Sequence, residues 1–141
     1  MKGLATLIKL HRRALDELRR KMATLENQKI QLQNLSVKLQ QELEREIDLA
    51  KKQTEMSRFF GDFAKRIQKR QEDIAREIRS LDKQMAQLQE KIAEAYAEVK
   101  KYEIALENAK RRAEEEERRK ETIMLDEVAG NQHRRKQKEE Q

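Results

Sequence analysis

An apolar stripe with a period of seven residues runs through the second half of the chain. Its two columns alternate at spacings of four and three residues. The first column holds Phe60, Ile67, Ile74, Leu81, Leu88, Ala95, Tyr102 and Ala109, and the second holds Ala64, Gln71, Ile78, Met85, Ile92, Val99, Leu106 and Ala113. Such a stripe forms the seam of a coiled coil, because a seven-residue repeat keeps one face of a helix against its partner. The pattern predicts a long helix over about 58–129.

The first half of the chain carries a stripe of the same period. Its first column holds Leu4, His11, Leu18, Leu25, Leu32 and Leu39, and its second holds Ile8, Leu15, Met22 and Leu43. Lys29 and Ser36 interrupt the second column, and Leu35 lies beside the gap. This pattern predicts a helix over about 3–51. An isolated helix would leave these leucines in water, so this helix also needs a partner.

A polar stretch separates the two stripes and predicts how the helices are connected. Residues 51–55 include no apolar side chain. We therefore predict a tight turn over about 52–57 and an antiparallel hairpin in which facing residues have numbers that sum to about 110. In this register Leu25 meets Met85, and Leu43 meets Ile67. The predicted fold class is all-α, a long antiparallel two-helix coiled coil that forms one domain over residues 1–141.

The same sequence allows a second arrangement. The heptad phase of the first stripe continues unchanged into the second, because Phe60 lies a multiple of seven residues after Leu4. One continuous helix of about 120 residues, roughly 180 Å long, could then pair in parallel with a second copy as a structural dimer. The polar gap favours the hairpin, and the stripes alone leave both arrangements open.

The C-terminal part of the second helix extends beyond the reach of the first helix, from about residue 107 onward. Charged residues four apart, such as Glu114 and Arg118, can sustain an exposed helix there. A short apolar cluster then follows, made of Ile123, Met124, Leu125 and Val128. The cluster fits either self-association or fold-back, or docking into another protein. Gly130 is a plausible stop signal, and we expect residues 130–141 to be frayed.

Two aromatic residues lie outside the seam at the start of the second helix. Phe59 and Phe63 are four residues apart and share a helix face. They could cover the turn, or they could anchor a binding partner, since aromatic anchors four residues apart are a recurrent recognition mode. Basic residues surround them: Arg58, Lys65, Arg66, Lys69 and Arg70. An acidic, partly apolar partner would suit this surface.

Composition narrows the class of protein. The 141-residue chain is 43% charged and 4% aromatic, with no proline, cysteine or tryptophan. That is typical of a long coiled coil rather than a compact domain, and a disordered chain would not keep a heptad phase. No apolar run approaches a signal peptide or a membrane span, so we expect a cytoplasmic protein without direct membrane insertion. The net charge is +6, but the aromatic residues of single-strand binders are missing, so no nucleic-acid partner is expected.

The sequence offers no catalytic constellation. His11 lies on the seam and His133 in the tail, and no serine has a base nearby in sequence. The three glycines are isolated, so they form no phosphate-binding loop. We therefore expect neither an enzyme, nor a cofactor, nor a metal site.

Three short motifs, taken in order, resemble the FliJ family of flagellar type III export proteins. The chain begins with Leu4-x-x-Leu7-x-x-Leu10-x-x-Arg13, and its second helix opens with Phe60-x-x-Phe63-x-x-x-Ile67. It closes with the segment 125–129, Leu-Asp-Glu-Val-Ala, followed by the basic run 134–136. The resemblance covers nearly the whole chain, and length and basic balance also agree.

The resemblance implies a function and a set of partners. Family members are similar to the central stalk of a rotary ATPase: they enter the ring of the hexameric export ATPase, promote its assembly, contact the membrane export-gate protein FlhA and assist export chaperones. The equivalent stalk of an injectisome, in type III secretion, is an alternative that the sequence leaves open. The implied location is cytoplasmic, peripheral at the inner membrane through partners.

The resemblance also implies contact residues. The surface for the export gate falls on Phe59, Phe63, Ile67, Arg70 and Ile74. The surface for the ATPase ring falls on Leu4, Leu7, Arg13, Ile123, Met124, Leu125 and Val128. Arg70 departs from the family pattern, because a small apolar residue would suit the gate contact better.

Overall fold

The computed structural model describes residues 2–52 and 57–140 and contains two helices. Helix α1 spans Lys2–Lys52 and helix α2 spans Ser57–Glu139. Within the described residues there is no strand, and no residue has a positive φ. The predicted all-α fold class is therefore confirmed. The helix ends differ by one residue from the expected ends on either side of the turn, and residues 53–56 of that turn lie outside the described range.

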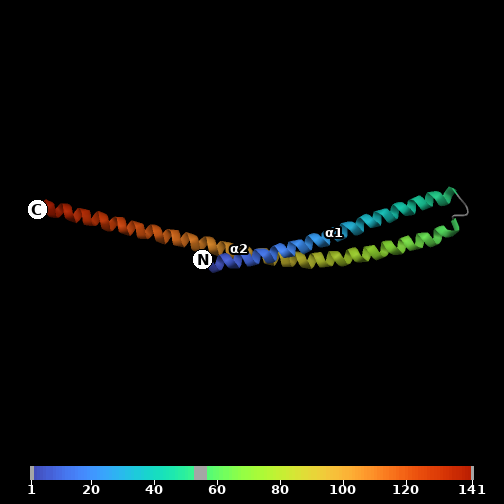
Figure 1. The fold of residues 1–141 in the computed structure, drawn as a ribbon, viewed down its shortest axis with the longest axis horizontal. Coiled ribbons are helices and arrows are strands. Elements are labelled where there is room, and N and C mark those ends of the chain that lie inside the picture. The colour runs from blue at the N-terminus through green and yellow to red at the C-terminus, as the bar shows by residue number, and fades with distance from the viewer. Residues whose placement is uncertain (1, 53–56, 141) are drawn as a thin grey trace. The chain divides into compact units, whose positions relative to one another are not determined.

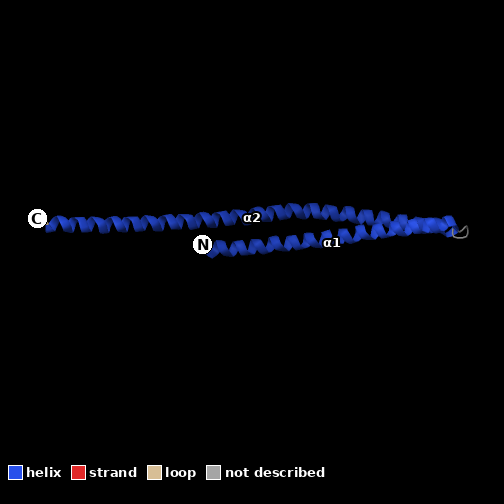
Figure 2. Ribbon diagram, turned by 90° about the horizontal axis from the view of Figure 1, so that it is seen from above, coloured by secondary structure: helices blue, strands red, loops and turns tan. Residues whose placement is uncertain are grey.

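The contacts divide the chain into two compact units. The tip unit comprises Arg13–Tyr96, and the terminal unit comprises Met1–Arg12 together with Ala97–Gln141. In each unit α1 and α2 run side by side in opposite directions (Figures 1 and 2). The two helices thus form an antiparallel hairpin within one chain. The alternative of one continuous helix that pairs in parallel with a second copy is wrong.

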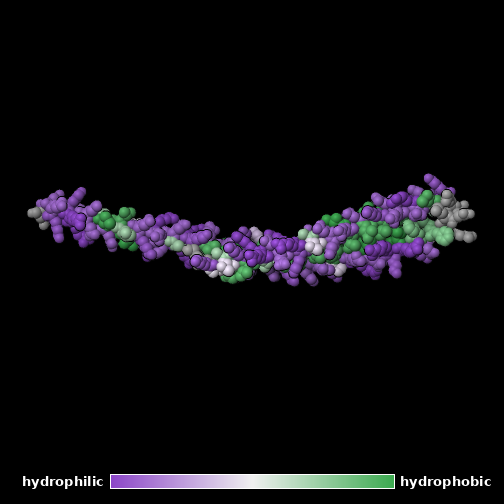
Figure 3. Space-filling model, in the orientation of Figure 1, coloured by the Kyte–Doolittle hydropathy of each residue, from purple (hydrophilic) through white to green (hydrophobic). Residues whose placement is uncertain are grey.

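The predicted seam forms the core of both units. Its buried side chains are Ile8, Leu15, Leu43, Ile67, Ile74, Leu81, Leu88 and Val99. Every other predicted seam residue is at least partly covered except Ala113, which is exposed. Figure 3 shows the seam of the tip unit as a green band between purple edges. Helices of this charge content are held together by this one apolar face, which contributes about 1.5–3 kcal/mol for each fully buried leucine or isoleucine.

Polar residues on or beside the seam are paired across the two helices. In the tip unit, Lys29 Nζ lies 2.7 Å from Asp82 Oδ1, and the Gln71 amide donates a hydrogen bond of 3.1 Å to Gln40 Oε1. Lys29 reaches past the seam edge to a carboxylate, so its charge is kept out of the apolar layer. These two pairs satisfy Lys29 and Gln71, two polar interruptions of the heptad pattern.

The cross-helix pairs also give the register. In the tip unit, both Lys29–Asp82 and Gln40–Gln71 have numbers that sum to 111. In the terminal unit, the sum is 115 for Arg12 and Glu103. The predicted value of about 110 is therefore close in the tip unit and several residues short in the terminal unit. The reason is physical: leucine stripes match in neighbouring registers, and only specific polar pairs distinguish between them.

Helix α2 does not end at Gly130, where the sequence predicted a stop and a frayed tail. The helix continues to Glu139, and the amide of Glu140 still donates a backbone bond of 3.1 Å to the Lys136 carbonyl. Gly130 has no positive φ, so it does not adopt the left-handed conformation of a helix-terminating glycine. A single glycine costs an exposed helix only about 1 kcal/mol, and Lys136 and Lys138 in the last turn favour the helix dipole.

No helix in the described ranges is long and apolar enough to cross a membrane.

Candidate protein-binding surfaces

The aromatic residues at the start of α2 form a small groove with the end of α1. The groove has a volume of about 200 Å³ and is lined by Glu46, Ala50, Phe59, Phe60, Phe63 and Arg66. Phe59 is 77% exposed, whereas Phe60 and Phe63 are half-buried. We call this set the tip groove. The sequence motifs did not assign Glu46 or Ala50 to a binding surface, although a register sum near 110 places Ala50 opposite Phe60.

The residues implied for gate binding do not share one surface. Phe59 and Phe63 both line the tip groove. Ile67 and Ile74 are 7% and 1% exposed and belong to the seam. Arg70 lies in solvent, with its guanidinium 3.9 Å from a Glu77 carboxylate oxygen. A partner that docks on the hairpin would therefore meet the aromatic residues and Arg70, while the two isoleucines hold the helix that carries them.

The surroundings of the tip groove are basic. Lys65, Arg66, Lys69 and Arg70 are all exposed, and Arg66 lines the groove itself. The acidic residue that α1 contributes to the groove is Glu46. An apolar floor with a cationic border suits an acidic partner with an apolar anchor.

The terminal unit carries a second groove at the start of α1. Its volume is about 300 Å³, and it is lined by Ala5, Ile8, Lys9, Arg12, Glu103, Leu106, Glu107 and Lys110. Leu4 is half-buried beside it, and Leu7 and Leu10 are exposed. Arg13, which the resemblance grouped with Leu4 and Leu7, is an exposed residue of the tip unit.

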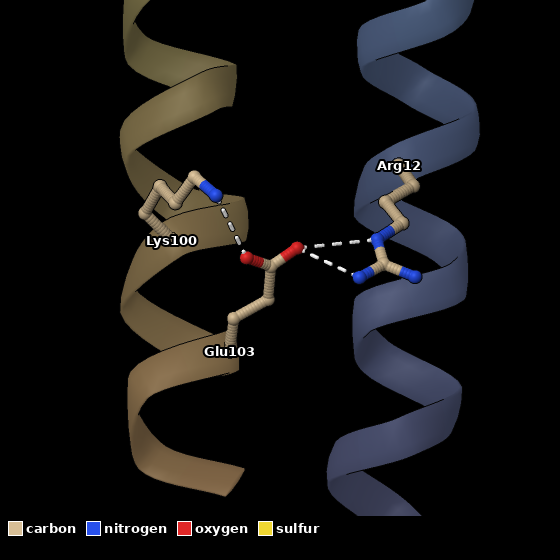
Figure 4. A network of polar contacts seen from close by, with 3 residues as sticks. All are labelled: Arg12, Lys100 and Glu103. Carbon is tan, nitrogen blue, oxygen red and sulfur yellow. Dashed lines mark hydrogen bonds and ion pairs between the residues drawn. The ribbon is translucent and has the colours of Figure 1, made fainter. Parts of the chain in front are cut away.

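Two lining residues of that groove, Arg12 and Glu103, belong to a charged cluster with Lys100 (Figure 4). Glu103 Oε1 accepts hydrogen bonds from Arg12 at 2.8 and 3.3 Å, and its other oxygen accepts one from Lys100 at 3.1 Å. The hydrogen bonds from Arg12 and then from Lys100 hold the pKa of Glu103 below its usual value. Next to them, the rings of His11 and Tyr102 stack with centroids 4.9 Å apart. Seam residue His11 therefore has an aromatic partner rather than a catalytic one.

The apolar cluster near the end of α2 is exposed to solvent. From Lys110 to Glu140, Gly130 is the one described residue that is not exposed. Ile123, Met124, Leu125 and Val128 are each more than half exposed, with Leu125 at 70%. Figure 3 shows them as an isolated green cluster on an otherwise purple stretch of the terminal unit. No described segment folds back onto the cluster, so the fold-back interpretation is excluded for the described residues.

Ion pairs along α2 support this exposed stretch. Arg118 lies 3.8 Å from Glu114, as the four-residue spacing predicted. Arg119 pairs with Glu116, three residues earlier, at 3.0 Å rather than with Glu115. Each such pair contributes a few tenths of a kcal/mol, which is enough in sum to favour a helix without a seam.

The described part of the chain holds no cluster of metal-ligating side chains. No group of three or more His, Cys, Asp or Glu residues could hold a metal ion there. His133 contacts Gln137 on the same exposed helix at 3.3 Å. The described surfaces are grooves and exposed apolar patches, and exposed apolar patches are typical of surfaces that bind other macromolecules.

Comparison with known proteins identified one family. The family model described as "Flagellar FliJ protein" matches residues 1–138. A search of curated proteins returned no match, and a search of solved structures returned none either.

Proposed function

Because the chain belongs to the flagellar FliJ family, a non-catalytic part of the flagellar type III export apparatus, we propose that it is the stalk of the export ATPase. In this proposal the terminal unit binds inside the ring of the hexameric ATPase and promotes ring assembly. The tip groove faces the membrane export gate, and the protein also assists export chaperones. Its location is the cytoplasmic face of the inner membrane, where its partners hold it.

The exposed apolar cluster of α2 is the observation that carries this proposal. Ile123, Met124, Leu125 and Val128 present a contiguous apolar surface on a helix that has no seam partner among the described residues. Clustered exposed apolar side chains of this kind mark binding surfaces. The start of α1, with exposed Leu7 and half-buried Leu4, is the other apolar part of the terminal unit.

The proposed mechanism is a shift in population. A helical stalk contacts the ring subunits unequally, so it binds one arrangement of the subunits more tightly than the others. The ring then adopts that arrangement more often, by a factor set by the difference in affinity. The protein contributes binding free energy and no chemical step.

The test is ATP turnover and ring assembly by the cognate export ATPase, with the full chain titrated in. We expect stimulation by the full chain and none by a variant in which Ile123, Met124, Leu125 and Val128 are replaced by serine. A matched control replaces Ile30 and Val37, two exposed apolar residues of the tip unit, by serine and keeps the stimulation. Equal activity of the cluster variant and the wild type would contradict the assignment of ring binding to this cluster.

The gate contact has its own test. We propose that FlhA binds Phe59, Phe63 and Arg70 directly, and that Ile67 and Ile74 act by holding this surface in place. Phe59→Ser should weaken binding of the FlhA cytoplasmic domain about tenfold or more, since a buried aromatic anchor contributes about 2 kcal/mol. Ile104→Ser, at an exposed apolar residue of the terminal unit, is the control and should leave the affinity unchanged. A larger loss of affinity in Ile104→Ser than in Phe59→Ser would contradict the assignment of the gate surface.

A further inference from the structure

One face of the tip unit carries two open grooves between α1 and α2. The first has a volume of about 470 Å³ and is lined by Gln28, Gln31, Leu32, Leu35, Glu77, Ser80 and Leu81. The second has a volume of about 350 Å³ and is lined by Lys21, Thr24, Leu25, Gln84, Gln87, Leu88 and Lys91. Apart from Leu35, each residue of the first groove has a counterpart in the second that lies one heptad away. Because residues seven apart share a side of a coiled-coil helix, both grooves lie on one side, which we call the groove face.

The groove face is poor in charge. Among the fourteen lining residues only Lys21, Glu77 and Lys91 are charged, whereas 43% of the whole chain is charged. Leucines form the floor, and glutamine, serine and threonine side chains form most of the borders. Depletion of charge around an apolar centre distinguishes the core of a protein interface from ordinary surface.

The three charged residues lie on either side of a central level of the face, with the acidic one at one end and the two basic ones at the other. On α2, Glu77 lies seven residues before Gln84 and Lys91 lies seven residues after it. Gln28 of α1 lies at the level of Gln84, because their numbers sum to 112, next to the value of 111 for the polar pairs of this unit. Lys21 lies one heptad from Gln28, at the Lys91 end. Among the lining residues, one end of the face is therefore basic and the other is acidic. The Glu77 carboxylate also lies 3.9 Å from the exposed guanidinium of Arg70, one heptad farther along α2.

We propose that the groove face is a self-association surface, through which two copies of this chain pair face to face and antiparallel. The two-fold axis passes at the level of Gln28 and Gln84. Glu77 of each copy then faces Lys91 of the other copy, and the neutral centre covers the leucine floors. The parallel alternative would place the basic end of one copy against the basic end of the other, so charge selects the antiparallel pairing.

On α1, two charged residues farther along the same face would also meet with opposite signs in the antiparallel pair. Glu17 and Lys38 lie one heptad beyond Thr24 and Gln31, two residues of the groove borders, and both are exposed. The antiparallel arrangement places Glu17 of one copy near Lys38 of the other, which adds a second pair of opposite charges.

The corresponding positions of α2 are both acidic. Asp73 and Glu94 lie one heptad beyond Ser80 and Gln87, and the pairing brings them to the same end of the interface. Asp73 already forms an ion pair with Arg76 within its own helix, which weakens that repulsion. The surface lies within the tip unit, and the inference does not rest on the proposed role at the export ATPase.

A charge swap tests the pairing directly. Glu77→Lys alone places two lysines together across the interface, and Lys91→Glu alone places two glutamates together. Each single variant should raise the Kd of self-association about tenfold, since two symmetric exposed pairs change from attraction to repulsion. The double variant restores opposite charges and should recover the wild-type Kd. Sedimentation equilibrium of the full chain at several concentrations measures all four proteins.

The control makes the same charge reversals at two residues outside the groove face. Lys83 and Glu90 are exposed, seven residues apart and of opposite charge, and neither lines a groove. Their single and double reversals should leave the Kd unchanged. A chain that stays monomeric at every concentration overturns the proposal. So does a dimer that ignores the Glu77 and Lys91 reversals, or one that is lost on truncation at Ala113, which would assign association to the end of α2.

A cross-linking experiment gives an independent measure of the same geometry. The chain has no cysteine, so a single introduced thiol reports only on its own counterpart in the second copy. Gln84→Cys lies on the proposed axis and should form a covalent dimer on mild oxidation. Lys83→Cys, one residue away on another side of the helix, should do so much more slowly. Equal rates for the two variants would contradict the proposed face.

Discussion

Truncation of Ile74 to alanine tests the seam at its most enclosed position. Ile74 is 1% exposed and lies where α1 covers α2 in the tip unit. Removal of a fully buried isoleucine side chain loses the free energy of its burial and leaves a cavity between the helices. Together these cost about 2–5 kcal/mol in well-packed cores. A seam between only two helices can close partly around the gap, so we expect about 3 kcal/mol.

Ile30 provides the matched control, because the same chemical change is made on the same unit. Ile30 is 52% exposed on α1. Ile30→Ala therefore loses only about half of the buried apolar area that truncation of a fully enclosed isoleucine would lose. Alanine also has the higher helix propensity, by about 0.4 kcal/mol. The net change should be no more than about 0.5 kcal/mol. The free-energy cost of Ile74→Ala should therefore be at least about six times that of Ile30→Ala.

Urea unfolding followed by circular dichroism at 222 nm measures both variants on the full chain. The midpoint for Ile74→Ala should fall clearly below that of the wild type, whereas the Ile30→Ala midpoint should stay close to it. If both variants shifted the midpoint equally, the assignment of the seam would be refuted. An equal shift would mean that the two faces of the hairpin are equally buried, contrary to the heptad argument.

Three further outcomes are expected. Gln40→Cys with Gln71→Cys should be joined within one chain by a short thiol-to-thiol cross-linker in a chain that otherwise lacks cysteine, because the ends of these two glutamine side chains meet across the hairpin; a product that is purely intermolecular would contradict the antiparallel hairpin. The lowered pKa of Glu103 adds stability above the ordinary glutamate pKa, and that stability is lost as pH falls through the depressed value. Glu103→Gln should therefore flatten the loss of the urea midpoint in acid, and an unchanged acid slope would contradict the Arg12 contact. Truncation after Ala113 should lower the ellipticity at 222 nm yet leave the urea midpoint of the hairpin unchanged, since the removed residues are exposed.

The tip groove and the apolar cluster differ in how far sequence predicted them. Both were visible as apolar residues off the seam. The residues of the cluster around Leu125 were evident from sequence, and the structure added that no described segment covers them. The tip groove did need the fold, since Glu46 and Ala50 join the aromatic residues only after α1 returns alongside α2. The gate residues Ile67 and Ile74 show the opposite case: the family resemblance grouped them with Phe63, although the heptad pattern had already placed both in the seam, where the structure buries them.

The sequence by itself determined the helices, their apolar faces and the absence of a catalytic constellation among its motifs. A period of seven in the apolar pattern is a local property of the sequence, and it does not depend on what the helix packs against. It also determined that an extended run of charge would separate the seam from the apolar cluster at Leu125.

Only the tertiary structure decided which helix each stripe packs against, in what direction and in what register. Repeated leucines have nearly the same burial energy in several registers, so the choice falls to long-range polar contacts such as Lys29–Asp82, Gln40–Gln71 and Arg12–Glu103. The partners of these contacts lie 31 to 91 residues apart in the chain, and no local pattern encodes them. The groove face also exists only in the tertiary structure, because its two borders come from different helices.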